Sequence, residues 1–167
     1  RQLRAVRPRV LICVDEPYLA SFGSAYVSLN RDQVIAMLDE VVAAIHQEGA
    51  LAGVHCCANT DWSVLLATAL DFLNLDAYGY IENLSLYPAE LRAFLDRGGI
   101  IAWGIVPNSE EIHAVTPAQL AARLWQGMET LAARARSRGI SLAVEEFARR
   151  SLITPCCGLG STTVEIA

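Results

Sequence analysis

Long apolar runs are missing from this sequence. Hydrophobic residues make up 53% of the 167-residue chain, yet no stretch reaches the roughly 18 apolar residues that a membrane-crossing helix needs. The two longest runs, around 10–14 and 100–106, have the length of strands. Such runs are typical of strands buried on both faces in a parallel sheet covered by helices. We therefore expect no membrane partner and a globular α/β fold.

Positive charge is also scarce. Lys and Arg total 13 against 18 Asp and Glu, for a net charge of −5, and the isoelectric point is about 5.1. A nucleic-acid-binding surface needs clustered cations to neutralise phosphates, so we expect no nucleic-acid partner. The arginine-containing N-terminus lacks the apolar segment and cleavage site of a signal peptide, which predicts a cytoplasmic protein.

The cysteine pattern argues against a disulfide framework. The chain has five cysteines, an odd number, and four of them form the adjacent pairs Cys56–Cys57 and Cys156–Cys157. Adjacent cysteines rarely bridge each other, because the geometry strains the intervening peptide. Disulfide-rich secreted domains usually space their cysteines apart. Metal binding or catalysis is therefore the better interpretation of these residues.

Strand and helix signals alternate along the chain. Strands are predicted at 9–14, 51–54, 75–81, 100–106 and 152–154, and helices at 33–47, 61–73, 88–97 and 116–138, with an ambiguous segment around 145–147. No linker or repeat interrupts this pattern, so residues 1–167 are expected to form one domain.

Repeated βα units predict a parallel sheet with right-handed crossovers. The sheet is either an open doubly wound one or part of a (β/α)8 barrel. A full TIM-type barrel takes about 250 residues, which is more than five βα units supply. Because the sequence begins abruptly at a strand and ends abruptly after Cys157, we expect the C-terminal half of such a barrel.

Distinctive polar residues follow each predicted strand. In strand order they are Asp15 and Glu16, His55 and Cys57, Glu82 and Asn83, Asn108 and Ser109, and Cys157. In βα folds the carboxyl ends of the strands form the edge that carries the active site. The agreement of five separate segments therefore predicts a functional site at this edge.

The triplet His55-Cys56-Cys57 has the spacing of a metal-binding motif. On an extended chain, His55 and Cys57 point to the same side while Cys56 points away. Zinc prefers imidazole and thiolate ligands in a tetrahedron and leaves one position open in catalytic sites. Cys157, at the end of the fifth strand, is placed to be a third ligand. The alternative is that these cysteines simply pack in the core, where free cysteine is common.

Acidic residues in two segments each have a structural and a functional interpretation. Glu82 either caps the helix that follows it or supplies a carboxylate ligand. Asp15 and Glu16 either form a turn with the following proline or make an anionic pocket for a substrate ammonium. The histidines outside the motif, His46 and His113, are expected to be structural or solvated. The three tryptophans are expected to pack in the core: Trp62, Trp103 and Trp125.

Four segments together resemble a known family. Residues 14–17, 54–57, 80–83 and 154–160 are similar, in order and separation, to motifs of the C-terminal catalytic barrel of cobalamin-independent methionine synthases. That family lies within the superfamily of uroporphyrinogen decarboxylase-like barrels. The similarity covers nearly the whole chain.

The resemblance implies a zinc site formed by His55, Cys57, Glu82 and Cys157. It also implies that Asp15 binds the amino group of homocysteine, with Glu16 and Asn83 nearby as substrate-binding residues. Asp15 and Glu82 are the expected catalytic residues, since Glu82 would move aside as the substrate sulfur arrives. The implied activity is zinc-dependent methyl transfer to a thiol, most simply homocysteine to give methionine.

Two departures from the family pattern affect the methyl donor and the local polarity. Val106 stands near the position of a histidine that helps protonate the leaving folate, and valine cannot act as a general acid. Cys156 stands where the family commonly has an aspartate. The donor is therefore either methyltetrahydrofolate or a methyl-corrinoid protein.

Three alternatives stay open from the sequence. They are a corrinoid-linked methyltransferase that uses another thiol such as coenzyme M, a metal-free decarboxylase-like barrel, and a non-catalytic half-barrel. The exposed edges of a half-barrel sheet also predict a partner, either a second copy in a homodimer or a missing N-terminal half.

Overall fold

Five parallel strands form one sheet, and helices connect each strand to the next. The computed structural model describes residues 2–25, 27–160 and 162–167. The strands are β1 (Leu11–Asp15), β2 (Leu51–Cys56), β3 (Phe72–Leu75), β4 (Ile100–Val106) and β5 (Ser151–Pro155). The α-helices are α1 (Gln2–Val6), α2 (Arg31–Gln47), α3 (Trp62–Ala67), α4 (Ala77–Tyr80), α5 (Pro88–Asp96), α6 (Pro117–Ser137) and α7 (Val144–Arg149). Short 3₁₀ helices are η1 (Pro17–Ser21), η2 (Ile81–Leu86) and η3 (Glu110–Ala114).

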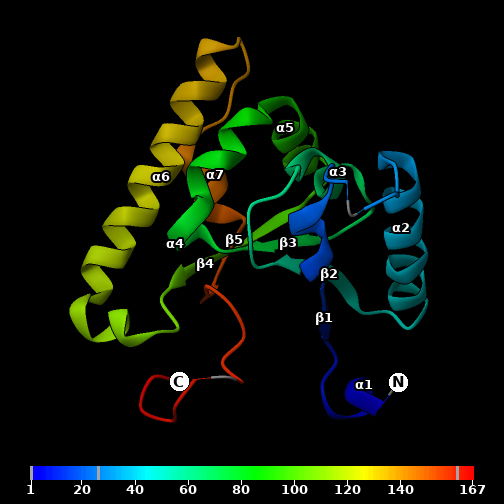
Figure 1. Cartoon of the computed structure of the whole chain (residues 1–167), viewed down its shortest axis with the longest axis horizontal. Helices are drawn as coiled ribbons and strands as arrows, with labels where there is room; N and C mark the ends of the chain where they lie inside the picture. The colour runs from blue at the N-terminus through cyan, green and yellow to red at the C-terminus, as the bar shows by residue number, and fades with distance from the viewer. Residues whose placement is uncertain (1, 26, 161) are drawn as a thin grey trace.

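The strand order decides which predicted architecture fits. The order is β1-β2-β3-β4-β5 and every pair is parallel. A doubly wound sheet would reverse its order at a switch point, whereas consecutive right-handed crossovers place all the connecting helices on one face. Figure 1 shows α3, α5 and α6 on one side of the sheet, while the two terminal segments extend on the other. The α/β class is confirmed, and the arrangement is consistent with half of a barrel.

The two longest helices begin with the same capping device. The Asn30 side chain accepts a hydrogen bond from the Gln33 amide, and the Gln33 side chain accepts one from the Asn30 amide. Thr116 and Gln119 repeat this arrangement at the start of α6. Such a capping box satisfies two donors that a helix end otherwise leaves unpaired. Helix α2 ends before Gly49, whose φ of 70° suits glycine. Both predicted helices are therefore confirmed.

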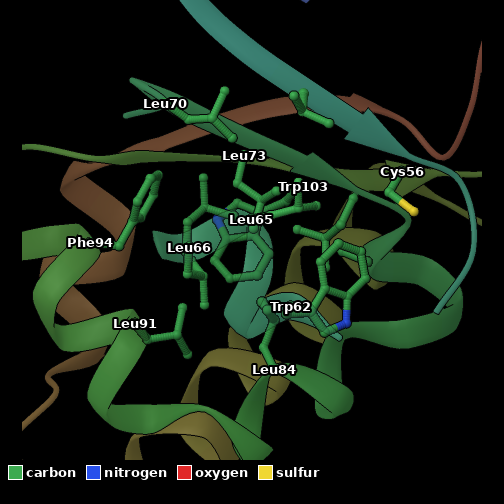
Figure 2. Packing of buried hydrophobic residues seen from close by; sticks show 14 of the residues in the cluster. Cys56, Trp62, Leu65, Leu66, Leu70, Leu73, Leu84, Leu91, Phe94 and Trp103 are labelled. Carbon is green, nitrogen blue, oxygen red and sulfur yellow. The ribbon is translucent and has the colours of Figure 1, made fainter. Parts of the chain in front are cut away.

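The core lies between the sheet and its helices. Figure 2 shows Trp62 and Leu65 of α3 packed beneath Leu73 and Trp103 of the sheet, and all four side chains are fully buried. Trp103 also meets the ring of Phe147 edge-on, with centroids 6.1 Å apart. Each such side chain contributes about 1.5–3 kcal/mol when it leaves water. No helix in the described part of the chain combines the length and the apolar character needed to cross a membrane.

The predicted strand at 75–81 is wrong. Strand β3 ends at Leu75, and the Asp76 side chain then accepts a hydrogen bond from the Gly79 amide at 2.8 Å, which starts α4. The helix predicted at 61–73 is also too long, because α3 ends at Ala67. At that end, the Arg97 guanidinium donates hydrogen bonds to the Leu66 and Thr68 carbonyl oxygens. The third strand therefore lies closer to the N-terminus than predicted, at Phe72–Leu75.

Burial on both faces holds for one long apolar run and fails for the other. Strand β4 is buried along its interior, as predicted. Strand β1 is not, because Leu11, Cys13 and Asp15 are exposed. These three residues lie on the face of the sheet away from the helices, which we call the open face. Part of the functional edge therefore lies on an uncovered surface.

The core assignment of Trp125 is wrong. Its side chain is 45% exposed on α6, whereas Trp62 and Trp103 are buried as predicted. Trp125 lines an apolar cavity of about 630 Å³ with Leu124 and Ile153. Because Ile153 belongs to the outermost strand, no further βα unit packs over this side of α6 in the described chain.

An ion pair joins α5 to α7. Arg92 Nη1 donates to Glu146 Oε2 at 2.6 Å, and Arg92 Nη2 donates to Glu146 Oε1. The two side chains are only 25% and 24% exposed. Hydrogen bonds from Arg92 hold the pKa of Glu146 below its usual value, so folding stabilises the ionised carboxylate.

Glu146→Gln should lower the free energy of unfolding at pH 7 by about 1 kcal/mol, because it removes one partner of a partly buried ion pair. Since the folded-state pKa is lowered, this stabilisation is fully present above the unfolded-state value of about 4.3 and is lost as the pH falls through the folded-state value. Urea unfolding at pH 7 and pH 3 measures it. Glu145→Gln, at an exposed neighbour, is the control. A difference from wild type that does not change with pH would contradict this account.

Candidate metal centre

The end of β2 presents two potential ligands on the open face. Val54 and Cys56 point into the core cluster, so the alternating residues His55 and Cys57 point the other way. The Glu16 amide donates to the His55 carbonyl at 2.9 Å, which ties the chain after β1 to this strand end. The predicted same-side placement of His55 and Cys57 is therefore confirmed.

Cys157 joins them from the far edge of the sheet. After β5 ends at Pro155, the Cys156 amide donates to the Val106 carbonyl at 2.9 Å and prolongs the pairing with β4. The ligand atoms of His55, Cys57 and Cys157 all lie within 4.8 Å of one another. One nitrogen and two sulfur donors at this spacing could hold a metal ion.

The state of the three side chains fits a cation. His55 is only 7% exposed, and neither ring nitrogen has a hydrogen-bond partner among the described residues. An unsatisfied buried polar group costs about 1–3 kcal/mol, and a metal bound to one nitrogen would offset this cost. Burial and the neighbouring Cys157 thiol raise the pKa of Cys57. A bound cation favours the thiolate and would reverse that effect.

The approach of the Cys157 turn depends on Gly104 in β4. A Cβ atom at this position would lie 2.5 Å from the Leu75 carbonyl oxygen and 2.9 Å from the Pro155 carbonyl oxygen. Both obstacles are backbone atoms, so neither can rotate away. The register of β4 and β5 also shifts between Gly104 and Val106. A residue without a side chain is therefore required where the fifth strand delivers Cys157.

The charged groups that act on the thiols at this edge are acidic. Asp15 raises the pKa of Cys57, and Glu16 raises that of Cys56, in each case after the larger effect of burial. Burial also raises the pKa of Cys156 to about 12, with contributions from Asp76, which its thiol contacts, and from Glu111. Asp15 acts on a potential ligand itself, and the other carboxylates act on the cysteines that precede Cys57 and Cys157 in the chain. The site therefore has a negative electrostatic surrounding before any cation binds.

Asp15 lies directly beside His55, because the two residues are paired in the register of β1 and β2. Its carboxylate is exposed on the open face. Glu16 instead accepts a hydrogen bond from the Tyr18 amide at 3.0 Å and caps η1. Glu16 therefore takes the turn role predicted for it, whereas the anionic pocket for a substrate ammonium stays a prediction.

Glu82 and Asn83 are not brought into this group. Both lie on η2 and line a polar cavity of about 330 Å³ whose other walls are α4 and α6. Glu82 is 61% exposed and accepts a hydrogen bond from Arg134 Nη2 at 2.9 Å. Its assignment as a fourth ligand stays a prediction, and so does the substrate contact of Asn83.

Asp76 is the acidic residue that the sequence reasoning missed. It follows β3 directly, as Asp15 ends β1, and it contacts the Cys156 thiol next to Cys157. The signal was the short run Phe72–Leu75 bounded by an aspartate. It was hidden because the later apolar residues 77–81 resemble a strand.

The remaining histidines lie outside the centre. His46 Nε2 lies 2.7 Å from Asp71 Oδ2, and His113 is an exposed residue of η3. Val106 ends β4 and supplies its carbonyl oxygen to the turn.

Comparisons of the chain with protein-family models, curated proteins and solved structures give no match. The geometry of this chain is therefore what bears on its function.

Gly104→Ala should disturb the Cys157 turn, because the added methyl group meets two fixed carbonyl oxygens. We expect about 1–3 kcal/mol lower stability and a clear loss of bound metal after equilibration with zinc and gel filtration. Gly158→Ala is the matched control, since nothing lies within 4 Å of its Cβ position. Equal metal content in the two variants would contradict the proposed need for a close approach.

Proposed function

We propose that this chain binds zinc through His55, Cys57 and Cys157 and uses it to transfer a methyl group to a thiol. The observation that carries the proposal is the convergence of these three ligands within 4.8 Å around a buried imidazole without a partner. Homocysteine is the proposed acceptor and methionine the product.

The donor set favours zinc over other abundant cations. Thiolates and imidazole suit zinc, whereas magnesium and calcium select oxygen ligands. Three protein ligands leave room for a fourth group, as in catalytic sites. Bound zinc would lower the pKa of a coordinated substrate thiol and so make it a nucleophile at neutral pH.

The charge around the centre supports an acceptor that carries an ammonium group. Asp15 beside His55, with Glu16 and Asp76 nearby, would attract the amino group of homocysteine. The sulfonate of coenzyme M would be repelled by the same carboxylates. Asp15 therefore orients the substrate, while the carboxylate that completes the ligand set is Asp76 or, as the sequence resemblance implies, Glu82.

In the transfer, a sulfur–carbon bond forms as the bond between the methyl carbon and its donor breaks, and the thiol proton leaves to solvent. Val106 offers no acid to protonate a leaving folate nitrogen. A methyl-corrinoid protein is therefore the preferred donor, because its cobalt keeps the bonding electron pair without a proton, and methyltetrahydrofolate is the alternative. The open face and the two sheet edges would be completed by an N-terminal half or a second copy.

Purified protein should hold one zinc ion per chain, and Cys157→Ser and His55→Gln should each lose most of it, because each removes a ligand. Cys13→Ser is the control, since Cys13 lies exposed on the same face of β1 but outside the group. Metal analysis after exhaustive dialysis measures this. Full zinc content in Cys157→Ser would rule out the centre as described.

Homocysteine should add one sulfur to the zinc coordination shell, and coenzyme M should not, because the acidic surroundings favour the ammonium group. Zinc-edge X-ray absorption with each thiol measures the change. Asp15→Asn should weaken homocysteine binding about tenfold, the loss of roughly one charge-assisted hydrogen bond. Asp76→Asn and Glu82→Gln, measured in the same way, identify the carboxylate ligand. A sulfur contributed by coenzyme M alone would overturn the assignment of the acceptor.

A further inference from the structure

Asn74 occupies the centre of the open face. It is paired in register with His55 of β2 on one side and with Ala102 of β4 on the other. Register neighbours in a parallel sheet point to the same face, so Asn74 lies beside the imidazole that is the deepest of the three potential ligands. The proposed reaction assigns it no part.

The Asn74 side chain crosses a complete strand. Its Nδ2 donates to the Ala102 carbonyl oxygen and to Thr154 Oγ1, at 2.8 Å each. Thr154 belongs to β5, which is separated from β3 by β4. Adjacent strands lie about 4.8 Å apart, so the hydrogen-bonded side chains of Asn74 and Thr154 together bridge about 10 Å between the two outer strands. The crossing has room because Ala102 and Gly104 place almost no side chain on this face of β4.

This crossing connects the two sources of ligands. His55 and Cys57 come from β2, next to β3, whereas Cys157 comes from the turn only three residues after Thr154. The register between β4 and β5 shifts between Gly104 and Val106, just where β5 leads towards Cys157. The bond from Asn74 fixes Thr154 relative to β3 regardless of that irregularity.

We propose that Asn74 is a positioning residue for the metal centre. By holding Thr154 across β4, it sets the separation between the Cys157 thiol and the ligands of β2. The inference rests on the proposed metal centre and adds to it a residue that does not touch the ion. Outer residues that orient ligands typically change metal affinity by about 10–100-fold when they are replaced.

The test uses the full chain with Co²⁺, whose thiolate charge-transfer and d–d absorption report ligand geometry. Asn74→Leu and Thr154→Val should each weaken Co²⁺ binding about 10–100-fold in competition with a chelator, and should alter the d–d bands. Thr154→Ser keeps the hydroxyl and should bind like wild type. Because both changes break one interaction, the double variant should lose little more than either single variant.

A control separates positioning from general stability. Thr68 is buried at the end of α3, and its Oγ1 donates to the Leu65 carbonyl at 2.6 Å. Thr68→Val should therefore lower the unfolding temperature while leaving the affinity for Co²⁺ and the d–d bands unchanged. Both quantities are measured well below the unfolding temperature of every variant.

Each outcome decides between the two proposals. If the wild-type chain binds no Co²⁺, the metal centre itself is overturned, and the positioning of its ligands with it. If wild type binds one Co²⁺ and Asn74→Leu binds it equally well, the centre stands and the positioning by Asn74 is overturned. Additive losses in the double variant would also overturn it, because the two side chains would then act independently.

Discussion

Consecutive parallel pairing of the five strands is the constraint on which the rest of the structure depends. It directs every carboxyl end to the same edge of the sheet, and it places the connecting helices on one face. The core therefore forms on that face alone, around Trp62 and Trp103. The opposite face is left open, and its polar residues need not be covered by a second helical layer. Residues from distant parts of the sequence can meet there.

The open face is shaped by small residues at defined positions. A Cβ atom on Gly53 would lie 2.2 Å from the Phe72 ring, so this ring lies over Gly53, two residues before His55 on the same face of β2. Ala102 and Gly104 leave the space that Asn74 crosses. Small residues in two central strands thus admit the Phe72 ring over β2 and the approach of the β5 turn to β4.

The buried imidazole and the thiols each make the site unfavourable without a bound cation, for different electrostatic reasons. His55 is buried without a partner, which disfavours an empty site. Burial, and to a smaller extent the nearby carboxylates, raise the pKa values of Cys57 and Cys156 and so disfavour free thiolates. A cation relieves both effects, because it accepts the imidazole lone pair and neutralises the surrounding negative charge. The same carboxylates then favour a substrate that brings a positive group.

Local patterns were enough for the features that depend on neighbours in sequence. The helices predicted at 33–47 and 116–138 correspond to α2 and α6, which begin at the capping residues Asn30 and Thr116, and the i, i+2 spacing of His55 and Cys57 placed both on one side of a strand. The apolar run 100–106 gave β4 its bounds. These features could be predicted because their physical cause lies within a few residues along the chain.

The features that failed depend on contacts between distant segments. Residues 75–81 look like a strand, but the Asp76 cap and the packing of α6 against η2 turn them into helix. Consequently Asp76, and not Glu82, lies at the strand end. Trp125 is a large apolar residue of the kind that usually packs in a core. It is exposed because no described element covers that side of α6. The amino-acid order thus decided the ligand types and their local spacing. Only the tertiary structure decided which carboxylate lies near them and that Asn74 reaches Thr154, because both depend on register across three strands.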